Sequence, residues 1–185
     1  MTTLLVTLIL LTLIKATPII YAALGGVISE RSGVINIGLE GMMAAGAFGA
    51  VIAAYFTHTP ILGLIAGIAS GAAIGYVLGL AATKFKVDQI VAGMGINLIC
   101  AGGAAYGLVL LFNQPGASRE VASFGNLGEW ILVAAAFAIT AALHYVLYRT
   151  PWGLRVRATG ENPFAVKSAG LDPLRFRLLA AVASG

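Results

Sequence analysis

Residues 61–82 read ILGLIAGIASGAAIGYVLGLAA, a stretch without one charged side chain. A helix of about 20 apolar residues crosses the roughly 30 Å hydrocarbon core of a bilayer. Glycine recurs at every fourth position of the stretch, at Gly63, Gly67, Gly71, Gly75 and Gly79. At 3.6 residues per turn these glycines line one slowly drifting stripe, which lets a second helix approach closely in a membrane. The stretch therefore predicts a membrane-spanning helix that packs tightly, within one subunit or between two.

The same apolar character recurs along the whole chain of 185 residues, which is 59% hydrophobic and 10% charged. A soluble domain carries about 25% charged residues, because its surface must face water. Four further apolar stretches are long enough to span, at approximately 3–28, 34–56, 89–112 and 128–148. They do not alternate polar and apolar residues as barrel strands do. We expect an all-α, polytopic transmembrane bundle in one domain, with five complete spans and a sixth begun near Pro173.

Basic residues predict the orientation, since short loops rich in Lys and Arg stay in the cytoplasm. If segment 149–177 is cytoplasmic, counting back through the spans puts nine of the eleven basic residues on that side. The N-terminus then lies outside, Arg119 lies in the outer loop 113–127, and Lys15 is the misfit within the first span. The net charge of +4 is thus a topology signal, and no nucleic-acid partner is expected.

Residues 29–41, SERSGVINIGLEG, place ionisable and amide side chains between two apolar runs, with three glycines that permit non-helical backbone. Such groups are costly at membrane depth and usually pair or line a wet cavity. Asn36 and Glu40 would share one face if this segment were helical. They either line the substrate pathway or hydrogen-bond broken backbone, and the sequence leaves both open. Gln89 and Asn97 are further pathway candidates, although helix packing is favoured for Asn97.

Segment 149–176 is too polar to span the membrane. Asn162 and Pro163 are typical of a helix start, where asparagine caps free amides and proline fits the first position. Gly170 can end that helix in a left-handed turn. We expect a short cytoplasmic helix held between two spans. It could dock on a soluble partner, or the segment could be an ordinary solvated basic loop.

The sequence offers little chemistry for catalysis. His58 and His144 stand alone, and no His, Cys, Asp or Glu cluster has metal-ligand spacing. No phosphate-binding glycine loop and no nucleophile elbow occurs. We expect no catalytic residues, metal or cofactor, and therefore no ATP site in this chain.

Two segments resemble one family. The run GGVISERSGVINIGLEG over 25–41 looks like the signature of nucleoside permeases of ABC importers. The broader group includes ribose and branched-chain amino-acid permeases. The run GLRVRATGENP over 153–163, with AGL at 169–171, resembles the family's cytoplasmic coupling segment.

The resemblance implies a plasma-membrane subunit that offers a pathway for nucleosides or related simple sugars. A soluble binding protein would deliver substrate from outside, and a second permease subunit, identical or not, would pair with this one. A separate ABC ATPase would bind the coupling helix, around 160–170. The residues then expected to couple to the ATPase are Arg155, Arg157, Gly160, Glu161, Asn162, Pro163 and Gly170.

Two alternatives stay open. An ion-coupled secondary transporter would need an ionisable coupling group, for which Glu40 and Lys15 are the candidates. A membrane scaffold without transport is the other. Family members usually continue with further helices after the coupling segment, so the sequence is expected to be a fragment or a truncated product.

Overall fold

The computed structural model describes residues 2–114, 116–118 and 120–185, so Arg119 lies outside the described residues. The described residues form helices and no strands. The helices are α1 (Thr2–Arg31), α2 (Leu39–Thr57), α3 (Pro60–Thr83), α4 (Gln89–Phe112), α5 (Gly125–Arg149), α6 (Pro151–Glu161), α7 (Pro163–Ser168) and α8 (Pro173–Ser184). The first five are long and apolar enough to cross a membrane. The predicted all-α polytopic bundle is confirmed, and α8 begins at the predicted proline.

The second span begins later than the sequence predicts. Helix α2 starts at Leu39 rather than near residue 34, because residues 32–38 form a turn and an extended segment. Asn36 is therefore not helical, and the helical face that it would have shared with Glu40 does not exist. The condition on which a common face for these two side chains depended, a helical segment, is therefore not met.

Helix α6 is an element that the sequence analysis missed, since segment 151–161 was expected to be a polar connection. Pro151 occupies its first position, and the hydroxyl of Thr150 accepts a hydrogen bond from the backbone N–H of Gly153 at 3.2 Å. A capping threonine followed by proline is a helix start signal. The same two residues also end α5, because only one residue separates the two helices.

Helix α3 packs against α2 through the first part of its glycine stripe. A methyl group built on Gly63 would lie 2.9 Å from the Cβ of Ala54, and one built on Gly67 would lie 3.1 Å from the Cβ of Ala50. Side chains at these positions would push the two helices apart. The glycines thus allow the close α2–α3 contact.

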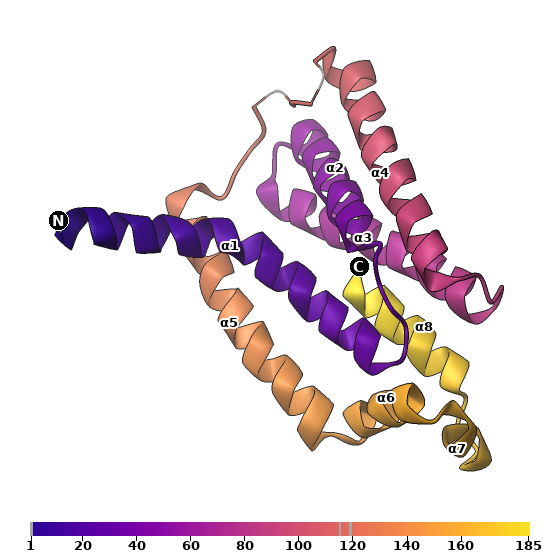
Figure 1. Cartoon of the computed structure of the whole chain (residues 1–185). Coiled ribbons are helices and arrows are strands. Elements are labelled where there is room, and N and C mark those ends of the chain that lie inside the picture. The colour runs from indigo at the N-terminus through magenta and orange to yellow at the C-terminus, as the bar shows by residue number, and fades with distance from the viewer. Residues whose placement is uncertain (1, 115, 119) are drawn as a thin grey trace.

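The second part of the stripe faces α8. Gly75 lies against the carbonyl oxygen of Ala181, Gly79 would place a methyl group 2.8 Å from the Leu178 side chain, and Gly71 abuts the backbone just after α8. One row of glycines on α3 therefore allows close packing of two helices of the same chain, α2 and α8. Figure 1 shows α3 behind α2, with α8 beside it near the middle of the molecule.

One end of the bundle collects the polar elements. Helices α6 and α7, the start of α8 and the ends of α1 and α5 lie there (Figure 1). Nine basic residues belong to these elements or to the adjoining α3–α4 connection: Arg31, Lys84, Lys86, Arg149, Arg155, Arg157, Lys167, Arg175 and Arg177. Which side of the membrane this end faces stays a prediction.

We expect Gly75→Val to lower the free energy of unfolding by about 1–3 kcal/mol, because the added side chain must displace the α8 backbone. Thermal unfolding of the detergent-solubilised protein measures this. Gly102→Val on α4 is the matched control, since a methyl group there meets no atom within 4 Å. Equal melting temperatures for the two variants would contradict the packing role.

Candidate functional site

The turn that follows α1 is closed by two serines. The carbonyl oxygen of Ser29 accepts from the backbone N–H groups of Ser32 at 3.0 Å and Val34 at 3.2 Å, and from the Ser32 hydroxyl at 2.6 Å. The Ser29 hydroxyl donates to the Val34 carbonyl at 2.7 Å. Gly33 has a φ of +84°, a left-handed conformation that glycine adopts without strain. Serine side chains that bond to nearby backbone compete with the helical ladder, so α1 ends here.

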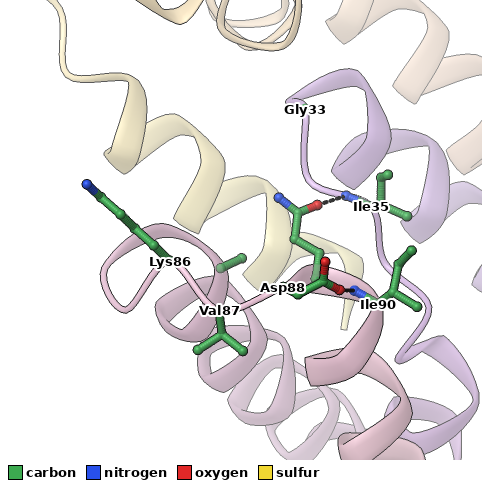
Figure 2. Close-up of a pocket in the computed structure, with 8 residues that line it drawn as sticks. Gly33, Ile35, Lys86, Val87, Asp88 and Ile90 are labelled. Carbon is green, nitrogen blue, oxygen red and sulfur yellow. Dashed lines mark hydrogen bonds between the residues drawn. The ribbon is translucent and has the colours of Figure 1, made fainter.

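The extended segment after this turn is held by amide side chains of α4. The backbone N–H of Ile35 donates to Oε1 of Gln89 at 2.6 Å (Figure 2). Asn97 donates from Nδ2 to the Ile37 carbonyl at 3.0 Å and accepts at Oδ1 from the Gly41 N–H at 2.7 Å. Backbone without helical partners needs such groups at membrane depth.

Asn97 also caps α2 from a neighbouring helix. Gly38 occupies the N-cap position and has no side chain that could bond to the first free amides of α2. The bond from Gly41 to Asn97 supplies one of the missing acceptors. These contacts favour the packing role for Gln89 and Asn97 over the pathway role.

Asn36 and Glu40 lie in different surroundings. Asn36 is 6% exposed and donates from Nδ2 to the Ser184 hydroxyl at 2.8 Å and to the Met42 sulfur at 3.4 Å. Its Oδ1 is the one buried side-chain oxygen or nitrogen of the described residues without a hydrogen-bond partner. Glu40 is exposed and makes no hydrogen bond or ion pair within the described chain. Asn36 thus keeps an unused acceptor inside the bundle, and Glu40 keeps a free carboxylate on its surface.

A shallow hollow of ≈ 450 Å³ adjoins the turn. Its lining comes from the turn, the end of α3 and the start of α4: Gly33, Ile35, Ala82, Lys86, Val87, Asp88, Gln89 and Ile90. Asp88 caps α4 by accepting from the N–H of Ile90 at 2.9 Å, and Lys86 extends away from Ile35 and Ile90 (Figure 2). The amide of Gln89 and the carboxylate of Asp88 are therefore engaged in holding backbone. The polar side chains that line the hollow form no nucleophile–base pair.

The short helix α7 forms where the sequence predicts it. Oδ1 of Asn162 accepts from the N–H groups of Phe164 and Ala165 at 3.1 Å each, Pro163 takes the first position, and Gly170 follows the helix with a φ of +78°. An apolar groove of ≈ 470 Å³ lies between α6 and α7. It is lined by Leu154, Arg155, Ala158, Glu161, Asn162, Ala165, Val166, Ala169 and Leu171.

The residues that the sequence assigned to coupling fall into two groups. Arg155 and Glu161 are exposed beside the groove. Arg157 and Gly160 lie on the inner side of α6 instead. Nε of Arg157 donates to the Leu147 carbonyl at 3.0 Å, and its guanidinium lies 4.9 Å from the centre of the Tyr148 ring.

Phe164 is a surface residue that sequence reasoning missed. Its side chain is 81% exposed, the most exposed of the large apolar side chains that the structure describes. A phenylalanine two residues after the capping Asn162 was the available signal. Together with the apolar groove beside α7, this exposed ring forms a candidate contact surface.

The fold and this site define a polytopic membrane protein with a broken, amide-held turn inside the bundle and a helical segment with an open apolar groove at its basic end. Residues 8–185 match the model of a protein family described as "branched-chain amino acid transport system / permease component". The chain belongs to this family. It is accordingly a multi-pass protein of the plasma membrane. Permeases of this kind are transport components rather than enzymes in themselves.

Curated relatives agree with this assignment. The chain is 34% identical to the guanosine ABC transporter permease protein NupQ of Bacillus subtilis and 31% identical to the nucleoside ABC transporter permease protein NupC of Lactococcus lactis, over 94% of its own length in each case. It is 31% identical to the putative glucose ABC transporter permease protein TsgC13 of Haloferax volcanii over 92%. The chain spans 62%, 62% and 56% of these relatives, less than two thirds of their length. No solved structure matches it.

We expect Asn97→Ala to lower the free energy of unfolding by about 1 kcal/mol, because it leaves the Gly41 N–H and the Ile37 carbonyl without their partners. Denaturant titration of the solubilised protein, followed by circular dichroism, measures the loss. Glu40→Gln is the control, since Glu40 is exposed and unpaired. If Asn97→Ala is as stable as that control, the amide does not hold the turn.

Proposed function

We propose that this chain is the permease subunit of an ATP-binding-cassette importer and forms part of a pathway for nucleosides. The main support for this proposal is the family match over residues 8–185, together with relatives named for guanosine and for nucleosides at 34% and 31% identity. The partners are a separate ABC ATPase, a soluble substrate-binding protein and a second permease subunit. The basic end of the bundle faces the cytoplasm, and the N-terminus lies outside.

The pathway passes the extended segment before α2. Asn36 supports this assignment because its free Oδ1 is an acceptor at bundle depth, and a nucleoside offers hydroxyl and amino donors. Glu40 adds an exposed carboxylate in the first turn of α2. Gln89 and Asn97 shape this segment through its backbone.

The ATPase docks on the groove between α6 and α7. An exposed phenyl ring beside an apolar groove, rimmed by Arg155 and Glu161, has the composition of a protein contact: an aromatic anchor, apolar walls and a polar rim. Arg157 and Gly160 lie on the opposite side of α6, against α5 and the turn after α1, and do not belong to this contact surface.

Phe164→Ala is expected to weaken ATPase binding by about tenfold or more, the loss that removal of an interfacial aromatic anchor causes. Co-purification of the tagged permease with its ATPase measures this, with membrane insertion checked in the same preparation. Leu127→Ala removes a side chain of comparable exposure, 76%, at the start of α5, away from the groove. Equal ATPase recovery from the two variants would exclude Phe164 from the docking surface.

Arg155→Glu is expected to weaken the same association, because Arg155 is exposed at the rim. Arg157→Glu is expected to reduce folded protein as well, since it loses the bond to Leu147 and the contact with Tyr148. Comparing the yield of folded permease with the amount of bound ATPase separates the two effects. Normal folding of Arg157→Glu would contradict its inward role.

The whole transporter in vesicles is expected to take up labelled guanosine, and other nucleosides in excess should compete while glucose should not. Disabling the catalytic glutamate of the ATPase should abolish uptake. Uptake that survives this change but collapses with an uncoupler would identify an ion-coupled carrier instead. Competition by glucose alone would shift the substrate class to sugars, for which the Haloferax volcanii relative is named.

A further inference from the structure

Most of the fully buried side chains that are larger than alanine gather at one junction. Seven such side chains are described, and six of them come from the end of α1 and the turn after it, from α6 and from the end of α5. These six are Ser29, Ser32, Val34, Leu147, Val156 and Thr159. The junction lies at the basic end, directly behind the α6–α7 groove, and close packing of this kind transmits displacement.

Backbone meets backbone at the centre of the junction. A methyl group built on Gly160 would lie 2.5 Å from the Arg31 carbonyl oxygen and 3.1 Å from the Gly33 nitrogen. One built on Gly33 would lie 3.1 Å from the Gly160 Cα. Helix α6 therefore rests on the turn with no side chain between them that could bend or yield.

Arg177 of α8 ties these two elements together. Its Nε donates to the Ser32 carbonyl at 3.2 Å and one of its terminal nitrogens donates to the Thr159 carbonyl at 3.5 Å. The guanidinium is half-buried and forms no ion pair with any acidic residue that the structure describes. A planar fork with several donors can hold two carbonyls at once, which a lysine ammonium does less well.

The other end of α8 holds the segment that follows the turn. Ser184 lies seven residues, or two helical turns, after Arg177 and accepts the hydrogen bond from Asn36 at 2.8 Å. Helix α8 therefore forms hydrogen bonds with the turn at Ser32 and with the extended segment at Asn36. The same helix contacts the glycine stripe of α3 along Gly75 and Gly79.

We infer that Arg177 is a positioning residue that fastens the α6–α7 segment to the turn, so that a push on the groove reaches Asn36. The inference rests on the proposed function, in which an ATPase supplies the push. Without this tie, α6 and α7 could swing on their connections to α5 and α8 and leave the turn in place. With it, α6, the turn and α8 move as one body.

The test uses the whole transporter, with ATPase and binding protein, in proteoliposomes. Arg177→Gln is expected to leave the ATPase bound and to lower substrate imported per ATP hydrolysed by about tenfold, the size of a typical coupling between sites. Arg177→Lys, which keeps one donor group, should lie between this variant and the unchanged protein. Lys84→Gln removes an exposed charge at the same end, whose side chain makes no hydrogen bond or ion pair with the described residues, and its ratio should stay unchanged.

The import-to-hydrolysis ratio separates this role from a merely structural one, because loss of folded protein lowers import and hydrolysis together. Gly160→Ala is the second variant, since its methyl group must part α6 from the turn, and it should lower the same ratio. Gly102→Ala is its control. Unchanged ratios in both Arg177→Gln and Gly160→Ala would overturn the inference.

A distance measurement covers the case in which Arg177→Gln folds poorly. Spin labels at exposed Lys167 on α7 and exposed Glu30 beside the turn should keep one distance with and without trapped nucleotide. Cys100→Ala provides the background for labelling. A nucleotide-dependent change of this distance in otherwise unchanged protein would overturn the inference. Failure of the ATPase to bind even the unchanged permease would instead overturn the proposed function, and the inference with it.

Discussion

The structure depends on one constraint, which is that a stretch of backbone interrupted inside a membrane-sized bundle must still find hydrogen-bond partners. The stretch between α1 and α2 is such an interruption. Its backbone finds partners in two serines of its own turn, in Gln89 and Asn97 of α4 and in Arg177 of α8. Ser184 of α8 accepts a hydrogen bond from the side chain of Asn36 in the same stretch. Elements far apart in the sequence are therefore held together by a short non-helical segment. Its neighbours cannot move far from it without leaving polar backbone unpaired.

Glycine residues allow the helices to pack closely against one another and against the turn. The stripe on α3 brings α2 and α8 to one helix, and Gly160 lets α6 rest on the turn. Since α8 contacts both α3 and the turn, the apolar packing of the bundle and the polar contacts of the turn share one helix. The α6–α7 segment, which is attached to α8, is thereby joined to the centre of the bundle.

Most polar side chains of the bundle form hydrogen bonds with backbone groups. Gln89 and Asn97 bond to the extended segment, and Arg157 bonds to the end of α5. Asn36 differs, because its oxygen is buried and unpaired. An unpaired buried acceptor costs about 1–3 kcal/mol, so a hydrogen-bond donor that reached this oxygen would be stabilised. Arg155, Glu161 and Phe164 lie on the exposed surface of α6 and α7.

The sequence by itself determined the all-α membrane class, the approximate spans, the start of α7 at Asn162 and Pro163, and the glycine spacing on α3, because periodicity, length and capping are local properties. It also pointed to the family through residues 25–41 and 153–163. Tertiary structure decided the rest. It placed Asn36 outside any helix, divided the glycine stripe between α2 and α8, and turned Arg157 and Gly160 inward while Phe164 faced outward. These outcomes depend on which helix lies beside which, and a hydrogen bond between Asn36 and Ser184, 148 residues apart, leaves no trace in the local pattern of either segment.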